Sequence, residues 1–570
     1  MQMRWGPELL GRDRALFRIW APDAATMQLE LQVSGSMAMQ PQGDGWFLAE
    51  AAAVEGTRYR FRTAEGLAVP DPASRLQDGG AHGWSVLVNP DGYAWQEPGW
   101  NGRPWEETVI EEVHAGLLGG FAGVADRLPE LAENGVTAIE LMPVGAFSGS
   151  RNWGYDGVLP YAVAASYGSP DALKALVDRA HSLGLMVFLD VVYNHFGPDG
   201  NYLGAYASGF FDRDADTPWG EAVAVTKQPV RRFFIDNALM WLDEYRLDGL
   251  RFDAVHAIAD DEFLDVMARE IRQRLPGRHI HLMLENEAND SDRLQPDLYD
   301  AQWNDDFHNT LHVLLTGETE AYYEGFADDP TQKLARCLAE GFVYQGETPP
   351  GSDHPRGKPS GDLPTTRFIS FLQNHDQTGN RACGERLTLL AEHERLRAAT
   401  ALLLLSPQIP MIFMGDSVGS HSPFLFFTDF EDELADAVRE GRRGEFANFA
   451  AFSDEAARQR IPDPNEIATF KNSHPLPGSR VDEWRAFYGR LLSIRHDSIV
   501  PRLKNARGLE AQVLGSGAVA ALWELGDGAQ LAIALNIGKD AVHFPAARGT
   551  LLFSLGDAGA PASFRAEIVE

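Results

Sequence analysis

The feature that most constrains this fold is a repeated alternation of short, strongly apolar runs with longer amphipathic stretches, which begins near Trp105. Such runs are typical of buried parallel strands, and the amphipathic stretches are typical of helices that cover them. In the stretch 169–183, Ser169 can cap a helix and Pro170 fits its first turn. A series of this kind over roughly 380 residues predicts an α/β chain with a (β/α)₈ TIM barrel and loop insertions. The clearest strand-like runs are residues 136–141, 186–189, 281–284, 368–372 and 410–414.

Both ends of the chain have a different pattern. The first residues alternate short strand-like runs with Gly, Pro and Asp, and the last residues return to short alternating runs, as all-β domains do. A length of 570 residues allows several domains. We therefore expect an N-terminal β-sandwich at 1–97, the catalytic barrel at 98–490, and a C-terminal all-β domain, a second β-sandwich, at 491–570.

Composition excludes some partners. The 49 Lys and Arg against 82 Asp and Glu give a net charge of −33, which repels phosphate backbones and anionic lipids. The two cysteines, Cys337 and Cys383, are too few for a disulfide framework and indicate a reducing compartment. Prolines interrupt the most apolar stretch, 398–414, and no secretory signal is visible. We expect a cytoplasmic protein with neither nucleic-acid nor membrane partners.

Polar residues gather where the predicted strands end. Four clusters, at 190–195, 248–256, 285–287 and 373–376, each follow an apolar run. Any one of them could be an Asx turn, a helix cap or a satisfied hydrogen-bonding pair. In a parallel barrel, however, the carboxyl ends of all strands meet on one face, where active sites form. The coincidence of four clusters in chain order therefore predicts an active site.

The clusters contain carboxylates that suit cleavage of a glycosidic bond, in which one group protonates the leaving oxygen and another attacks or stabilises the anomeric carbon. Asp253 lies two residues after Arg251 and so on the same strand face. We expect Arg251 to lower the pKa of Asp253 and keep it nucleophilic. Burial at the end of an apolar run is expected to raise the pKa of Glu285, as a general acid requires. His195 and His375 are expected to be neutral and to bind sugar hydroxyls.

Two aromatic residues favour a carbohydrate substrate. Tyr155, within 153–156, could stack on a sugar, and Trp303 lies close to Asp305. Core packing explains each of them equally well.

At this point the four clusters resemble the signature regions of the α-amylase superfamily of glycoside hydrolases. Within it, the chain resembles the malto-oligosyltrehalose trehalohydrolases, on stretches 152–158, 190–203, 302–308, 373–380 and 423–429 and on the N-terminal module around 70–95. The resemblance implies that Asp253 is the nucleophile, Glu285 the general acid/base and Asp376 the third carboxylate. It implies substrate-binding or supporting roles for Tyr155, Asp190, Asn194, His195, Arg251 and His375. From the clusters and the aromatic residues themselves we add His256, Trp303 and Asp305 to the expected substrate-binding set. We assign no metal, because we find no complete calcium cage, and no cofactor.

The resemblance further implies a retaining hydrolysis of the α-1,4 bond between a malto-oligosaccharide and its terminal trehalose, with a malto-oligosyltrehalose synthase as functional partner. The alternatives are a glucan branching enzyme, a general maltodextrin hydrolase, and, in another class, an inactive glucan-binding protein. Two segments depart from the family pattern, at 114–119, with Leu117-Leu118, and at Asp416-Ser417-Val418. We expect them to alter sugar subsites at the rim.

Overall fold

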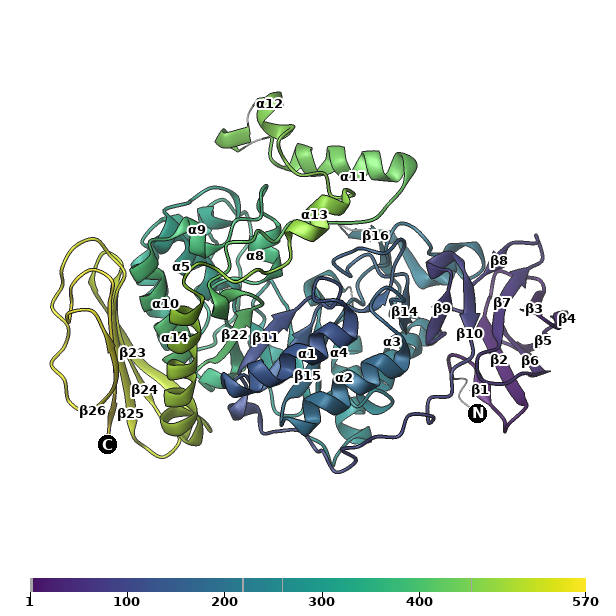
Figure 1. Ribbon diagram of the computed structural model, residues 1–570, viewed down its shortest axis with the longest axis horizontal. Coiled ribbons are helices and arrows are strands. Elements are labelled where there is room, and N and C mark those ends of the chain that lie inside the picture. Colours follow the sequence, from purple (N-terminus) through teal and green to yellow (C-terminus); the bar gives the residue numbers. More distant parts are fainter. Residues whose placement is uncertain (1–3, 218–219, 259, 448, 453) are drawn as a thin grey trace.

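The computed structural model describes residues 4–570 except 218, 219, 259, 448 and 453. The N-terminal and C-terminal sheets lie at opposite ends of the long axis, with the barrel between them (Figure 1). Among the described residues, no helix is long and apolar enough to cross a membrane. The domain boundaries after residues 97 and 490 remain predictions.

The N-terminal region contains two antiparallel sheets. One has the strand order β1 (Glu8–Leu9), β2 (Arg14–Trp20), β6 (Trp46–Ala52), β5 (Gln40–Gly43). The other has the order β4 (Gly35–Ala38), β3 (Met27–Leu31), β7 (Arg58–Thr63), β10 (Trp84–Val86), β9 (Leu76–Asp78), with β8 (Ala68–Val69) beside β7. Residues in β2 and β7 are buried in alternation, and the rings of Phe17 and Tyr59 pack across the interface between the sheets with centroids 4.7 Å apart. The predicted N-terminal β structure is confirmed.

Eight parallel strands form a closed barrel, which confirms the predicted fold class. Their order is β11 (Ile110–Val113), β12 (Ala138–Leu141), β15 (Met186–Val191), β18 (Gly249–Phe252), β19 (His281–Leu284), β20 (Ala301–Trp303), β21 (Phe368–Ser370), β22 (Ile409–Phe413). The main connecting helices are α1 (Gly120–Glu133), α2 (Pro170–Ser182), α3 (Gln228–Asp243), α4 (Asp261–Arg274), α5 (Asp305–Thr316), α7 (Pro330–Glu340) and α10 (His393–Leu405), and α14 (Val481–Ile494) follows the last strand. Helix α2 begins as predicted, with the Ser169 side chain accepting a hydrogen bond from the Ala172 N–H at 3.1 Å.

The barrel interior changes character along its axis. Its middle is apolar and includes Ile110, Ala138, Phe188 and Met283. Two residues further along β11 and β12 come Glu112 and Glu140, which point into the same interior because side chains alternate along a strand. The polar end is the carboxyl end of the strands, where insertions lie. One insertion carries α11 (Asp432–Glu445), α12 (Glu455–Arg458) and α13 (Ile467–Asn472), which project from the body at the top of Figure 1.

The C-terminal region is one five-stranded antiparallel sheet, so the expected second β-sandwich is wrong for the residues described. Its order is β23 (Arg507–Gly515), β24 (Ala518–Glu524), β25 (Gln530–Asn536), β27 (Ser563–Val569), β26 (Thr550–Leu555). Barrel helices cover its inner face in place of a second sheet: the Trp523 indole N–H donates to the Leu338 carbonyl of α7 at 2.9 Å, and α10 packs against β25 and β27. The all-β character is confirmed.

Candidate active site

The three predicted catalytic carboxylates follow three different barrel strands. Asp253 directly follows β18 and Glu285 directly follows β19, and their backbone N–H groups bond to the carbonyls of Val191 and Phe252 at 3.0 Å. Asp376 is the second residue of α8 (His375–Gly379), after β21. All three therefore lie at the carboxyl end of the barrel, as the sequence predicts.

Arg251 joins two of these carboxylates. Its Nη1 lies 2.8 Å from Asp253 Oδ1 and 2.5 Å from Asp190 Oδ2, and its Nη2 lies 3.1 Å from Glu285 Oε2. The guanidinium stacks on the Trp303 ring at 4.0 Å from its centroid. Arg251 is 0% exposed. It was expected to bind substrate, but the structure gives it no open surface, and it holds the carboxylates in place instead.

The electrostatics of Asp253 differ from the expectation. Burial raises the pKa of Asp253 well above its usual value, and the adjacent Arg251 charge offsets only part of that rise, since Glu285 and Asp190 oppose it. The predicted contact with Arg251 is present, but the predicted net lowering of the pKa is wrong. The physical reason is burial first, and then the neighbouring charges of Glu285 and Asp190, which together outweigh the Arg251 charge.

Glu285 has polar surroundings. Its Oε2 accepts a hydrogen bond from the Ala254 N–H at 2.6 Å and lies beside Arg251, and 18% of the side chain is exposed. The burial expected for Glu285 is therefore incomplete. Ala254 has φ of 41°, in the left-handed region that costs a non-glycine residue conformational energy. Ala254, which directly follows Asp253 in the chain, thus donates its N–H to Glu285 from a strained backbone conformation.

The surroundings of His375 favour its charged form, which differs from the expectation of a neutral imidazole. Burial opposes the charge, but Asp376 and Glu112 outweigh it and raise the pKa of His375 well above its usual value. Its Nδ1 lies 2.6 Å from Glu112 Oε1, and its Nε2 lies 3.3 Å from Asp376 Oδ1. Burial raises the pKa of Asp376, yet the His375 charge outweighs that effect and holds the pKa below its usual value. Asp376 is thus the ionised, 37% exposed carboxylate of the group.

Tyr155 lies at the centre of a second group of predicted residues. Its ring stacks on His375 with centroids 5.0 Å apart, and its hydroxyl donates to Asp190 Oδ2 at 2.6 Å. His195 is 5% exposed, its Nδ1 and Nε2 lie 2.9 and 3.0 Å from Asn194 Oδ1 and the Tyr155 carbonyl, and burial lowers its pKa to about 4. His195 is neutral, as expected, but its ring nitrogens contact protein atoms. Asp190 and Asn194 are buried and support the site from behind.

The last three predicted residues are divided between the site and the core. Asp305 lies beside the cluster, where it accepts a hydrogen bond from Gln377 Nε2 at 3.1 Å; burial and the Glu285 charge raise its pKa to about 8. His256 is exposed and bonds to the Glu287 N–H at 3.3 Å through Nδ1. Trp303 is 1% exposed under Arg251, so it is a core residue and offers no face to a sugar.

Two interior glutamates were not identified from the sequence. Glu112 is buried and bonds to both the imidazole and the backbone N–H of His375. Glu140 is buried beside Asp190 and Arg251, and burial raises its pKa well above its usual value. The available signal was the presence of charged residues inside runs that otherwise read as fully buried strands, since buried carboxylates are rare without a partner.

The two departures from the family pattern do not lie on an open rim. Leu117 and Leu118 are 6% and 9% exposed. The Asp416 side chain is 12% exposed, accepts a hydrogen bond from Gln373 Nε2 at 2.6 Å, and lies 3.3 Å from Arg386 Nη1. Ser417 and Val418 are buried. The expected change in rim subsites is therefore not explained by direct contact.

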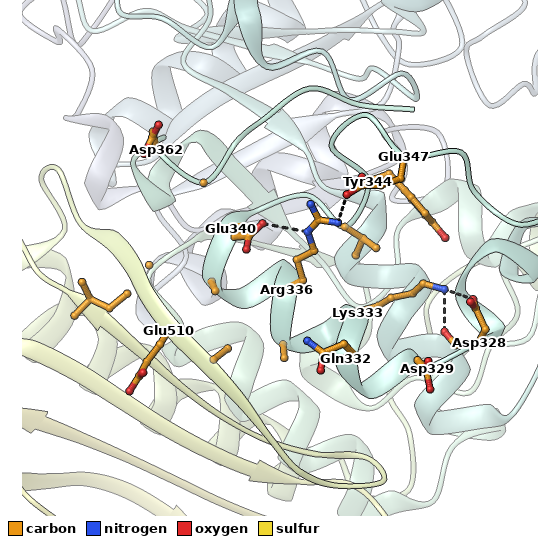
Figure 2. A pocket seen from close by; sticks show the side chains of 17 residues that line it. Asp328, Asp329, Gln332, Lys333, Arg336, Glu340, Tyr344, Glu347, Asp362 and Glu510 are labelled. Carbon is orange, nitrogen blue, oxygen red and sulfur yellow. Dashed lines mark hydrogen bonds and ion pairs between the residues drawn. The ribbon is translucent and has the colours of Figure 1, made fainter. Parts of the chain in front are cut away.

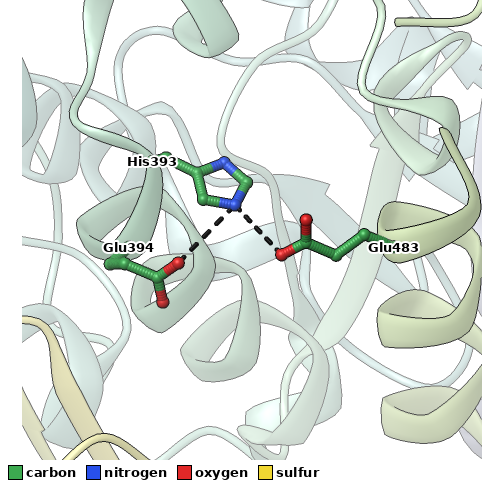
Figure 3. A group of neighbouring side chains, drawn as sticks. All are labelled: His393, Glu394 and Glu483. Atoms are coloured by element: carbon green, nitrogen blue, oxygen red, sulfur yellow. Dashed lines mark hydrogen bonds and ion pairs between the residues drawn. The ribbon is translucent and has the colours of Figure 1, made fainter. Parts of the chain in front are cut away.

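Two other polar groups lie away from the barrel mouth. A cavity of about 730 Å³ lies between α7 and β23, but its cations are already paired, Arg336 with Glu340 and Glu347 and Lys333 with Asp328 (Figure 2). Among the described residues, one group has the spacing to hold a metal: His393, Glu394 and Glu483 (Figure 3). Arg397 lies 3.2 and 3.3 Å from its two carboxylates and already offsets part of their charge.

Comparisons with known proteins agree with this geometry. Residues 73–216 match the family model described as alpha amylase, catalytic domain, and residues 506–567 match a domain of unknown function, DUF3459. A malto-oligosyltrehalose trehalohydrolase of Deinococcus radiodurans is 39% identical over 90% of this chain and 87% of its own. The chain belongs to the malto-oligosyltrehalose trehalohydrolase family. Members of this family are glycoside hydrolases of the alpha-amylase family, which places the chain in that class of enzyme.

Two further comparisons bear on the fold and on the alternatives. A crystal structure from Salmonella typhimurium, named provisionally as an alpha amylase, is 44% identical, covers 100% of both chains and superposes with a TM-score of 0.95. A 1,4-alpha-glucan branching enzyme of Myxococcus xanthus is 30% identical but covers only 47% of this chain and 42% of its own. The trehalohydrolase family therefore accounts for much more of the chain than the branching enzyme does.

Proposed function

We propose that this protein hydrolyses the α-1,4 bond between a malto-oligosaccharide and its terminal trehalose, releasing trehalose with retention at the anomeric carbon. One observation carries the mechanism: a single buried guanidinium holds Asp253 and Glu285 together at the carboxyl end of the barrel. Retaining glycosidases need two carboxyl groups about 5 Å apart, one as nucleophile and one as acid/base. Family membership supports the choice of substrate.

In the first step, Asp253 attacks the anomeric carbon while Glu285 donates a proton to the oxygen of the departing trehalose. The C–O bond breaks, its electron pair stays with the trehalose oxygen, and an ester forms between the glucan and Asp253. In the second step, Glu285 removes a proton from water, which attacks the same carbon and releases Asp253. The Arg251 charge beside Asp253 favours the carboxylate in which each cycle begins and ends.

Asp376 has a different role in the proposal. It is the carboxylate with the largest exposed fraction of the three, 37% against 12% and 18%, and it is held ionised by His375. We assign it the binding of sugar hydroxyls at the scissile residue. Tyr155, half-buried beside His375, is assigned a stacking contact with the same sugar.

Direct digestion tests the substrate. Purified protein is incubated with maltotriosyltrehalose and, separately, with maltopentaose, and trehalose, glucose and new reducing ends are measured by chromatography. Trehalose release much faster than any cleavage of maltopentaose is expected. Equal cleavage of both would indicate a general maltodextrin hydrolase, longer or branched products a transferase, and no product an inactive binding protein.

Variants test the catalytic roles. Asp253→Asn and Glu285→Gln are each expected to lower kcat by at least about 10³-fold, because each removes a covalent or proton-transfer step. Glu287→Gln is the matched control, since this glutamate lies two residues beyond Glu285 with 74% of its side chain exposed. Near-native rates in either catalytic variant would contradict the assignment.

The proposal extends to the setting of the enzyme. A substrate with a terminal trehalose has to be formed by another enzyme, so we propose a functional partnership with a malto-oligosyltrehalose synthase. We also propose a cytoplasmic location, for which the support is that Cys337 and Cys383 are both free thiols.

A further inference from the structure

The contact between Glu112 and His375 joins the first barrel strand to the turn after the seventh. Glu112 Oε1 lies 2.6 Å from His375 Nδ1, and Glu112 Oε2 accepts the His375 backbone N–H at 3.0 Å. The carboxylate therefore bonds to both the imidazole ring and the backbone N–H of His375. Glu112 and His375 are each 1% exposed, so water does not compete for these bonds.

His375 begins the short helix that carries Asp376. In α8, Asn374 caps the helix by accepting the Asp376 N–H at 2.9 Å, and His375 Nε2 lies 3.3 Å from Asp376 Oδ1. A chain of contacts thus runs from Glu112 through His375 to Asp376. The side chain of Glu112 does not reach the open part of the site, because His375 lies between.

We propose that Glu112 is a positioning residue, which keeps His375 protonated and thereby holds Asp376 ionised and correctly oriented for substrate. The proposal rests on the proposed function of Asp376. A buried imidazolium needs a compensating carboxylate on the side away from Asp376, and Glu112 supplies it. Without that charge, His375 would lose its proton in the alkaline range, and Asp376 would lose its cationic partner.

Other charged and titratable groups face His375 and set the background for any pH measurement. They come from several elements: Glu140 on β12, Asp190 on β15, Asp376 on α8, and His114 and Tyr155 in loops. None of them replaces the bidentate contact of Glu112. A substitution at Glu112 alone should therefore change the protonation of His375.

The test compares neighbouring substitutions. Glu112→Gln removes the charge with little change of shape, and Glu112→Asp keeps the charge. Glu111→Gln is the matched control: Glu111 is also 1% exposed but points out of the barrel, toward Arg127 and Glu130 of α1. Trehalose release from maltotriosyltrehalose gives kcat/KM between pH 6 and 8.5.

Between pH 6 and 8.5, we expect the fall in kcat/KM to be at least about tenfold larger for Glu112→Gln than for the native enzyme. The reason is that losing a close carboxylate lowers the pKa of His375 by at least about one unit. Glu111→Gln and Glu112→Asp should keep the native pH profile. An equal loss at every pH would indicate a merely structural role and overturn the proposal. If Glu112→Gln does not fold, an alkaline fall in Glu112→Asp would overturn it as well.

A substrate-free measurement separates this proposal from the proposed function. In ¹⁵N-histidine NMR spectra, the His375 imidazole is assigned by its absence in His375→Gln. We expect it to stay protonated to a higher pH in native protein than in Glu112→Gln. Identical titration in the two proteins would overturn the role of Glu112, whereas a native enzyme that releases no trehalose would overturn the proposed function alone.

Discussion

Replacing Arg251 by lysine tests whether one guanidinium organises the active site. The substitution keeps the charge but leaves one nitrogen where two nitrogens now contact three carboxylates, Asp190, Asp253 and Glu285. It also removes the planar group that stacks on Trp303. The single lysine ammonium can form a close ion pair with Asp253 or with Glu285, but not with both.

The expected magnitude follows from these contacts. A hydrogen bond to a charged group contributes about 1.5–3 kcal/mol, and breaking a buried ion pair costs about 3–5 kcal/mol. We expect Arg251→Lys to lower the free energy of unfolding by about 3–5 kcal/mol. If a similar amount is lost from the transition state, kcat/KM falls about 10²–10⁴-fold. The acidic limb of the pH profile should move up by about one unit, because Asp253 loses part of its stabilising charge.

The assays are urea unfolding and trehalose release from pH 5 to 8. Arg495→Lys is the matched control, since Arg495 is also 0% exposed but bonds only to the carbonyls of Leu404, Ser406 and Gln408. The control should lose stability and keep kcat/KM. Activity of Arg251→Lys within threefold of native would refute the reasoning, and so would an equal loss of kcat/KM in the control.

Two further substitutions test single groups. Tyr155→Ala should raise KM about fivefold, from loss of about 1 kcal/mol of ring stacking, whereas Tyr155→Phe, which keeps the ring, should raise it less. Equal KM values for native and Tyr155→Ala would place the ring outside the subsite. Asp305→Asn tests linkage by urea unfolding at pH 5 and 8. The folded pKa of Asp305 is raised to about 8, so the folded state binds one more proton than the unfolded state between about pH 4 and 8 and native stability falls as pH rises through that range. Asp305→Asn should lose this fall, by at most about 1 kcal/mol per pH unit; unchanged pH dependence would contradict the raised pKa.

The sequence predicted the barrel and the position of Asp253, Glu285 and Asp376 at the carboxyl ends of its strands, because both depend on local pattern. It could not separate residues within one cluster. Asp248 and Asp253 belong to the same run, yet Asp248 lies just before β18, where it accepts bonds from the Trp100 indole N–H at 2.7 Å and the Val187 N–H at 2.9 Å. Asp248 thus lies at the amino end of the barrel strands, opposite the active site. Only the direction of the strand distinguishes a structural from a catalytic aspartate.

The protonation states of Asp253 and His375 also could not be predicted from the sequence. The sequence places Asp253 two residues from Arg251, but the net pKa depends on Glu285 and Asp190, which come from other strands. The sequence analysis expected a neutral His375, and the only carboxylate beside it in the sequence is Asp376. Glu112, which also favours the charged form of His375, is 263 residues away and is brought there by the closure of the barrel. Protonation is a property of the assembled site.

The position of residues 416–418 suggests that substrate preference depends on another part of the chain. Asp416 is tied to Gln373 and Arg386 beneath the mouth, so its effect on a bound sugar has to pass through those neighbours. The insertion with α11 to α13 contacts the proposed sugar-binding region more directly. Its Arg442 donates to the carbonyls of Gly379 and Arg381 at 2.7 and 3.0 Å, just beyond Asp376 in the chain. Because this guanidinium fixes the turn that follows a proposed sugar-binding carboxylate, differences in substrate preference between enzymes with the same three carboxylates are better sought in this insertion than at residues 416–418.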